Sequence, residues 1–274
     1  ETPTVMILGG EDSPGIVARL KESKKIKVVP TSVDWKEDIT EKKVRAAVQL
    51  PEKFESGLTA GAAAAGAGQG ATLAILGGFR ALVADLVWIR MYAVWERRDL
   101  PGTETLLRLV TTIDPRPVYF WLNAARITAY DFPFWRILAA GGFEQVPEEV
   151  QQRLSHEQSR SALRGLETAM RFHPASVELW VERANIELNR LRDLDAAAES
   201  YRRAWQLPGA PYYVARLRAE VLRRAGRRAE ALEWLLRLHP TLPPADEGAA
   251  AELVLGRIRD LERELGVPAD RVYR

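Results

Sequence analysis

A repeat with a period of 34 residues is the feature that most constrains how this chain can fold. The segment DLDAAAESYRRAWQLPG, residues 193–209, aligns with GRRAEALEWLLRLHP, residues 226–240, and places Ala197 over Ala231. In a pair of helices, small residues at such positions allow close approach, while the large residues around them fill the gap. Each repeat is therefore expected to be a helix–turn–helix unit that buries its apolar face by stacking on its neighbours.

Further helical stripes, broken by proline and glycine, surround these two units. One covers about residues 82–115, and another covers about 117–172 with an insertion at 131–155 between its helices. Insertions of this kind emerge at one edge of a stack and are often functional. The stretch from 246 to 265 has apolar residues at alternating spacings of three and four, which predicts a capping helix.

This helical period resembles that of the tetratricopeptide repeats, and the resemblance spans about residues 80–240. It implies a right-handed α-solenoid whose first helices line a concave groove that holds a peptide or a partner protein. The expected fold is mainly α, a tetratricopeptide-like α-solenoid preceded by a small α/β unit. The stretch LGGFRALVADLVWIR, residues 76–90, also resembles the start of bacterial repeat proteins that are anchored by a membrane helix just upstream.

The basic residues divide the chain into two compositions. All eight lysines lie before residue 54, whereas 29 of the 31 arginines lie after residue 58. The uncharged tract GLTAGAAAAGAGQGAT, residues 57–72, lies between the two parts and is typical of a linker. We interpret the division as the joining of sequences from two genes; the alternatives are chance and an N-terminal region with its own history.

The first part of the chain alternates between strand and helix signals. Apolar runs at 5–8 and 26–29 and a β-prone run at 44–50 predict three strands, and Ser13-Pro14 predicts the start of a helix after the first of them. Elements of this order and length indicate a small parallel α/β unit. The Gly9-Gly10 loop invites a phosphate-binding interpretation, but it lacks the spacing of a phosphate-loop motif, and the acidic pair that follows it would repel an anion.

The stretch VRAAVQLPEKFESGL, residues 44–58, combines a β-run with an apolar-Pro-Glu-x-Phe pattern. Together with the preceding strand, helix and short strand ending in VVP, it resembles the extracytoplasmic domain of permeases of the type-2 exporter class of ABC transporters. The resemblance covers about residues 3–58. It implies a place in a membrane transport assembly and no catalytic residue in this segment.

The predicted organisation has four parts. Residues 1–58 form a small α/β unit, 59–72 a Gly/Ala-rich linker, 73–245 tetratricopeptide-like helical repeats with the insertion at 131–155, and 246–274 a capping helix and tail. For residues 60–79 the alternative is a weak membrane span, because they are uncharged, although six glycines make them poorly hydrophobic.

Signals for catalysis, metals and nucleic acid are weak. The absence of cysteine excludes disulfides and thiolate zinc sites, and the three histidines are far apart and lack metal-ligand spacing. Neither a catalytic triad nor a cofactor motif is indicated, so no catalytic, cofactor-binding or metal-binding residue is predicted. The arginine-rich stretch 216–228 raises the possibility of nucleic-acid binding, but its basic residues are interleaved with acids and the net charge is only +2.

The repeat register places a set of aromatic and polar side chains on the expected concave face. Guanidinium groups on this face would favour carboxylates on a partner, although a solvated surface is the simpler interpretation of these arginines. The aromatic residues could equally belong to the core or anchor a partner. The predicted partner-binding residues are Trp88, Tyr92, Trp95, Tyr119, Arg126, Tyr130, Asn189, Arg190, Tyr213, Arg216 and Arg223.

The function predicted from these observations is that of a non-enzymatic scaffold for protein–protein interaction. We expect a protein or peptide partner of acidic character, no nucleic acid, and an association with the components of an ABC-type membrane transport assembly at the bacterial cell envelope. The alternative is a small-anion-binding or enzymatic α/β module carried on a helical scaffold, with its site at the Gly9-Gly10 loop.

Overall fold

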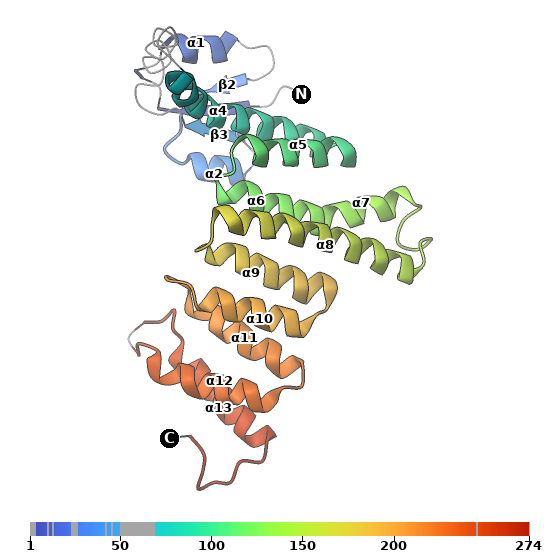
Figure 1. Ribbon diagram of the computed structural model, residues 1–274, viewed down its shortest axis with the longest axis vertical. Coiled ribbons are helices and arrows are strands. Elements are labelled where there is room, and N and C mark those ends of the chain that lie inside the picture. Colours follow the sequence, from blue (N-terminus) through green and yellow to red (C-terminus); the bar gives the residue numbers. More distant parts are fainter. Residues whose placement is uncertain are drawn as a thin grey trace. The chain divides into compact units, whose positions relative to one another are not determined.

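The computed structural model describes residues 4–9, 11–12, 14–22, 27–41, 43–44, 46–49, 69–244 and 246–273. Over these residues the protein is mainly helical, with a small parallel sheet near its N-terminus (Figure 1). The predicted mainly α fold class is confirmed at this level. The chain divides into two compact units, Glu1–Pro115 and Arg116–Arg274, which we call the N-terminal and C-terminal units.

The sheet of the N-terminal unit contains three parallel strands in the order β2-β1-β3. Its elements are β1 (Thr4–Leu8), α1 (Pro14–Glu22), β2 (Lys27–Val29), α2 (Trp35–Thr40) and β3 (Ala46–Gln49). Val5 and Met6 of the central strand are buried, as expected for the strand that has neighbours on both edges. All three predicted strands are found, and Pro14 occupies the first helical position, where its missing N–H costs nothing. Ser13 and the predicted helical turn after Pro51 lie outside the described residues.

Two long helices belong to the same compact unit as the sheet. They are α4 (Gln69–Trp95) and α5 (Leu100–Ile113), and they pack against each other. Asp99 caps α5, since its carboxylate accepts a hydrogen bond of 3.0 Å from the backbone N–H of Gly102. Residues 59–68 of the predicted linker lie outside the described residues, and residues 69–72 form the first turn of α4. The linker predicted over 59–72 therefore stays a prediction at 59–68, whereas at 69–72 the structure shows a helix instead.

The C-terminal unit is built from helices that follow one another in space as they do in sequence (Figure 1). Its elements are α6 (Val118–Arg126), the π-helical turn η1 (Ile127–Asp131), α7 (Phe132–Ala139), α8 (Glu148–Phe172), α9 (Val177–Ile186), the π-helical turn η2 (Glu187–Leu191), α10 (Leu194–Trp205), α11 (Tyr212–Arg224), α12 (Arg228–Leu238), the short 3-10 helix η3 (His239–Thr241) and α13 (Ala251–Glu264). The predicted insertion at 131–155 is mostly helical, because η1 continues α6 into α7 and α8 begins at Glu148.

Local signals set the ends of these helices. Ser176 and Asp193 cap α9 and α10, and the side-chain oxygen of Asp193 lies 2.9 Å from the backbone nitrogen of Ala196. Gly226 separates α11 from α12 with a φ of +78°, a left-handed conformation that L side chains rarely adopt.

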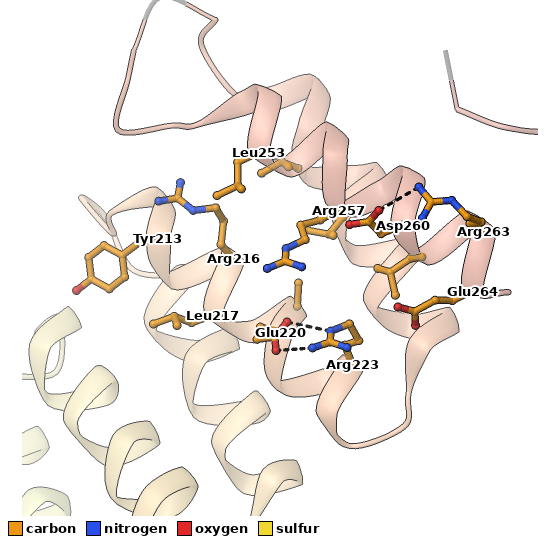
Figure 2. A pocket seen from close by; sticks show the side chains of 14 residues that line it. Tyr213, Arg216, Leu217, Glu220, Arg223, Leu253, Arg257, Asp260, Arg263 and Glu264 are labelled. Atoms are coloured by element: carbon orange, nitrogen blue, oxygen red, sulfur yellow. Dashed lines mark hydrogen bonds and ion pairs between the residues drawn. The ribbon is translucent and has the colours of Figure 1, made fainter.

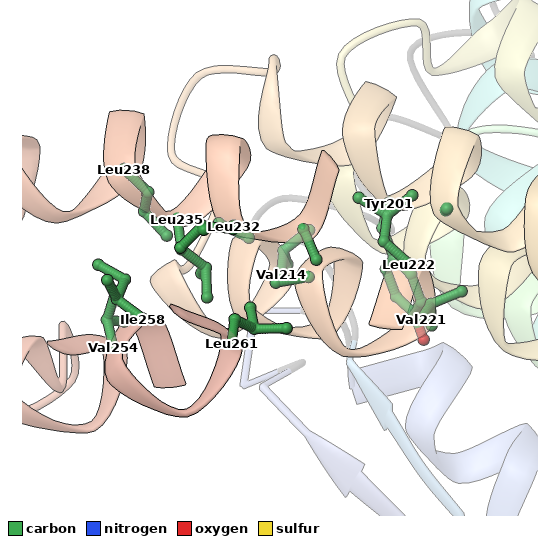
Figure 3. Packing of buried hydrophobic residues seen from close by; sticks show 14 of the residues in the cluster. Tyr201, Val214, Val221, Leu222, Leu232, Leu235, Leu238, Val254, Ile258 and Leu261 are labelled. Atoms are coloured by element: carbon green, nitrogen blue, oxygen red, sulfur yellow. The ribbon is translucent and has the colours of Figure 1, made fainter. Parts of the chain in front are cut away.

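Small and large apolar residues interlock in the core shared by α9 to α13 (Figure 3). Ala197 and Ala231, the two alanines aligned by the repeat, are both fully buried. Leu222, Leu235 and Tyr201 are large buried residues of the same cluster. The predicted burial of the aligned alanines is therefore confirmed.

Candidate partner-binding site

The eleven predicted partner-binding residues fall into both units. Trp88, Tyr92 and Trp95 lie on α4 in the N-terminal unit, and the other eight lie in the C-terminal unit. On α4 the rings of Trp88 and Tyr92 meet edge to face with their centroids 5.4 Å apart, and those of Tyr92 and Trp95 do so at 6.3 Å. Trp88 is buried, which agrees with the alternative that this aromatic residue belongs to the core and is not an anchor for a partner.

An ion pair joins α6 to α9. The Arg126 guanidinium donates from Nε to Oε2 of Glu182 at 2.8 Å, and its Nη2 lies 2.7 Å from the same oxygen. The Glu182 side chain is only 5% exposed, whereas that of Arg126 is 54% exposed. A buried carboxylate needs such a partner, because an unpaired buried charge is costly. Tyr119, the second residue of α6, is exposed.

The two π-helical turns contact each other through Arg190. Its Nε donates a hydrogen bond of 3.1 Å to the carbonyl of Ala129 in η1, and its guanidinium lies 5.2 Å from the centre of the Tyr130 ring. A π-turn interrupts the regular hydrogen-bond ladder of a helix, which gives side chains access to backbone carbonyls. Burial raises the pKa of Tyr130, and a hydrogen bond with Asn189 opposes that shift. Arg190 is thus held within the fold by a carbonyl and a ring.

Sequence reasoning missed three polar residues beside this cluster. Glu182 is the buried partner of Arg126, and the hydroxyl of Tyr201 donates to Oδ1 of Asn185 at 2.6 Å. Burial raises the pKa of Tyr201 to about 12, so its hydroxyl stays protonated at neutral pH. Glu182 and Asn185 precede Asn189 by seven and four positions, which is the spacing of one helix face. This spacing is the signal by which Glu182 and Asn185 could have been identified from the sequence. We call Arg126, Tyr130, Glu182, Asn189 and Arg190 the π-turn surface.

A groove of about 630 Å³ lies between α11 and α13 (Figure 2). Apolar side chains from both helices and from α12 line it, among them Leu217, Leu235 and Leu261. The charged residues that line it are Arg216, Glu220, Arg223, Arg257, Asp260, Arg263 and Glu264. Apolar surface with polar groups around it is the usual character of a binding groove. We call it the α11–α13 groove.

Most arginines of the groove already have partners. Arg223 binds Glu220 through two hydrogen bonds of 3.0 and 2.8 Å, and this contact holds the pKa of Glu220 below its usual value. Arg216 donates from Nη1 to the carbonyls of Gly248 and Ala249, each at 2.9 Å, and so fastens the loop before α13.

Arg257 differs from these arginines. It is exposed, and within the described part of the chain it forms no hydrogen bond or ion pair, although its charge also lowers the pKa of Glu220. Figure 2 shows its guanidinium directed into the groove, between Arg216 and Glu220. Arg257 was not among the residues predicted from the sequence, because it lies on the capping helix, outside the 34-residue repeat.

The residues predicted to share the concave face of the C-terminal unit are only partly brought together. Tyr213, Arg216 and Arg223 line the α11–α13 groove. Arg190 does not line it, since its guanidinium is engaged by the carbonyl of Ala129 and the ring of Tyr130. Whether any of these residues binds a partner stays a prediction.

The N-terminal glycine loop is described only in part. Gly9 has a φ of +74°, a left-handed conformation suited to glycine, while Gly10 lies outside the described residues. Glu11 and Asp12, which follow, are exposed.

One of the three histidines contacts the C-terminal tail, because Nδ1 of His239 lies 3.0 Å from the hydroxyl of Tyr273. Within the ranges that the structure describes, no cluster of three or more His, Asp or Glu side chains is arranged to hold a metal ion.

Comparison with models of protein families and with curated proteins finds no match to this chain. Of the helices in the described ranges, none combines the length and the apolar character needed to cross a bilayer. Function must therefore be argued from the grooves and surfaces themselves.

Proposed function

We propose that the C-terminal unit is an α-solenoid of tetratricopeptide type and that its α11–α13 groove binds an acidic segment of a partner protein. Support for the solenoid comes from the 34-residue period, from the full burial of Ala197 and Ala231, and from the packing of each helix on the next. In this arrangement α6, α9 and α11 are the first helices of successive pairs. They carry the π-turn surface and one wall of the groove.

The observation that carries the binding proposal is an arginine without an ion-pair partner beside an apolar surface. Arg257 is exposed and uses none of its donors within the described part of the chain. Leu253, one turn earlier on α13, also lines the groove and is 54% exposed. A partner segment with a carboxylate one helical turn from an apolar side chain would bind both residues. Its carboxylate would pair with the guanidinium fork of Arg257, and its apolar side chain would cover Leu253.

In this proposal the chain is a non-enzymatic scaffold of an ABC-type transport assembly at the bacterial cell envelope. The support for that setting is the resemblance of residues 3–58 to a permease extracytoplasmic domain, of which the structure describes a parallel β–α–β arrangement up to Gln49. The setting is independent of the groove, which would bind an acidic segment whatever protein supplies it.

The groove is tested by reversing one charge. We expect Arg257→Glu to weaken binding of a fluorescein-labelled peptide that contains Leu and several Glu residues by tenfold or more, since it replaces attraction by repulsion. The loss should shrink as salt is raised, because screening weakens both contributions. Thermal melting should be unchanged, as an exposed arginine without a partner contributes little to folding.

Arg259→Glu is the matched control, because Arg259 is exposed on the same helix but does not line the groove. Equal losses in the two variants would show only a general charge effect, and no loss in Arg257→Glu would contradict binding at the groove. Arg216 and Arg223 are poorer choices for the test. Their side chains fasten the loop before α13 and pair with Glu220, so their reversal also perturbs the fold.

A further inference from the structure

The exposed face of α8 carries a straight row of arginines. Arg153, Arg160, Arg164 and Arg171 follow one another at intervals of seven, four and seven residues. At about 100° per residue these intervals place all four within a sector of about 40°, and at about 1.5 Å per residue the row is about 27 Å long. We call this row the α8 arginine stripe.

The stripe lies opposite the side of α8 that packs into the protein. The buried residues of α8 are Ser159, Ala162, Leu166 and Ala169. Around the helix axis they lie at angles of about 160–240° from the stripe. All four arginines are exposed. The stripe therefore points away from the core.

Two carboxylates of α8 bind arginines of neighbouring helices. Glu157 accepts a hydrogen bond from Arg136 of α7 at 3.0 Å, and Glu167 accepts one from Arg183 of α9 at 3.1 Å. The arginines of the stripe form no hydrogen bond or ion pair through their side chains with any residue that the structure describes. Their guanidinium groups are therefore available to a partner.

The N-terminal part of the stripe borders a polar hollow of about 580 Å³. Three arginines of the stripe, Arg153, Arg160 and Arg164, line it together with His156, Gln152 and the carboxylates of Glu149 and Glu157. Arg160 and Arg164 are four residues apart, and their like charges repel each other and destabilise the helix slightly. A partner's carboxylates would attract both guanidinium groups and offset this repulsion.

We propose that the α8 arginine stripe is a second interaction surface, and that its partner is an acidic helix of another protein. A helix that carries glutamates at the same seven, four and seven intervals would present a single row of carboxylates that matches the stripe over its whole length. None of the four arginines lines the α11–α13 groove, so the two surfaces are distinct.

The charge pattern favours an acidic helix over nucleic acid. Glu149, Glu157 and Glu167 lie within about 40° of the centre of the stripe on either side, so the positive row is only one side chain wide. The broad array of phosphates on a duplex would meet these carboxylates, whereas a helix that touches α8 along one line would avoid them. The net charge of +2 likewise supplies no general attraction to a polyanion.

Two synthetic peptides test the proposal on the full chain. One is a labelled 22-residue helical peptide with glutamates at seven, four and seven intervals, a design chosen to span a row about 27 Å long. The other has the same composition with its glutamates spread around the helix. We expect the first to bind at least tenfold more tightly, and the double variant Arg160→Glu/Arg164→Glu to weaken its binding at least tenfold.

Three controls keep the outcome interpretable. The milder variant Arg160→Gln/Arg164→Gln should weaken binding by a smaller factor, and far-UV circular dichroism shows that both double variants are folded. Arg259→Glu/Arg271→Glu makes the same change in net charge at exposed positions away from the stripe and should change binding less than twofold. Arg257→Glu should also leave it unchanged, which separates this surface from the α11–α13 groove.

Equal affinity for the two peptides would overturn the proposal. So would duplex DNA that binds at least as tightly as the patterned peptide and is lost in the same variants, because the stripe would then serve nucleic acid.

Discussion

The π-turn surface and the α11–α13 groove both contain arginines, but the surroundings of these arginines differ. On the π-turn surface, Arg126 pairs with a buried carboxylate and Arg190 binds a carbonyl and a ring. In the groove, Arg223 pairs with Glu220, whose side chain is 37% exposed, and Arg257 has no ion-pair partner in the described part of the chain. Arg126 and Arg190 therefore contribute to folding, whereas Arg257 in the groove is available for binding.

Burial of the partner accounts for this difference. Removing a guanidinium from a buried carboxylate leaves a charge in a medium that solvates it poorly, whereas water replaces a guanidinium at an exposed carboxylate. A register that predicts which side chains share a face does not predict which of them already have partners.

The largest expected effect tests the register on which the comparison rests. Ala231→Trp should lower the free energy of unfolding by about 3 kcal/mol or more, because Ala231 is fully buried among tightly packed side chains and the indole has no space. Ala197→Trp should do the same. Urea denaturation measures both.

Ala229→Trp is a useful control, since Ala229 lies on the same helix and is exposed. If the variants at positions 197 and 231 were as stable as this control, the close packing of the aligned alanines would be wrong, and with it the assignment of helix pairs.

A second prediction contrasts the two arginines directly. Arg126→Ala should destabilise the protein by about 3 kcal/mol, because Glu182 would remain buried without its partner. Arg223→Ala should cost less than about 1 kcal/mol, since Glu220 is already in contact with water. The measurement is again urea denaturation at neutral pH. Similar costs for the two variants would remove the distinction between the surfaces, while partial recovery in Arg126→Lys would support a charge effect.

The features that could be predicted from the sequence are those that depend on local spacing. The three strands, the helix that starts at Pro14 and the buried alanines at 197 and 231 follow from periodicity and from residues with strong local preferences. The capping helix predicted over 246–265 is also found, but it begins later, at Ala251, and ends at Glu264. Tyr213, Arg216 and Arg223 also line one groove, as the register suggested.

The remaining features depend on contacts between residues far apart in the chain. The π-turns, the buried state of Glu182, the use of Arg216 to fasten the loop before α13 and the position of Arg257 opposite α11 have no marker in a 34-residue period. The insertion predicted at 131–155 lies between the helices of one pair, but its helical start, where α6 continues through η1 into α7, was not predicted. A π-turn has hydrogen bonds from i to i+5 and so shifts the apolar periodicity by about one residue, which is why a continuous helix does not show a continuous stripe in the sequence.

The smallest expected effect is a difference in the response to acid of two glutamates, one near each surface. Burial raises the pKa of Glu187, which begins η2, whereas the hydrogen bonds from Arg223 lower the pKa of Glu220. When the folded pKa is raised, the native state takes up a proton before the unfolded state does, so stability rises as pH falls from neutrality toward the unfolded value of 4.5. When the folded pKa is lowered, the stabilising contribution is complete above 4.5 and is lost as pH falls through the folded value.

Glutamine variants isolate these two contributions. As pH is lowered from 7 toward 4.5, the stability of the wild-type protein relative to Glu187→Gln should increase. As pH is lowered further below 4.5, its stability relative to Glu220→Gln should decrease. Free energies of unfolding in urea at several pH values give both differences, and the variants serve as each other's controls because they share the same chemical change. Slopes of the same sign would mean that the two carboxylates lie in similar surroundings, and the contrast between a buried carboxylate in η2 and a solvated one in the groove would then be wrong.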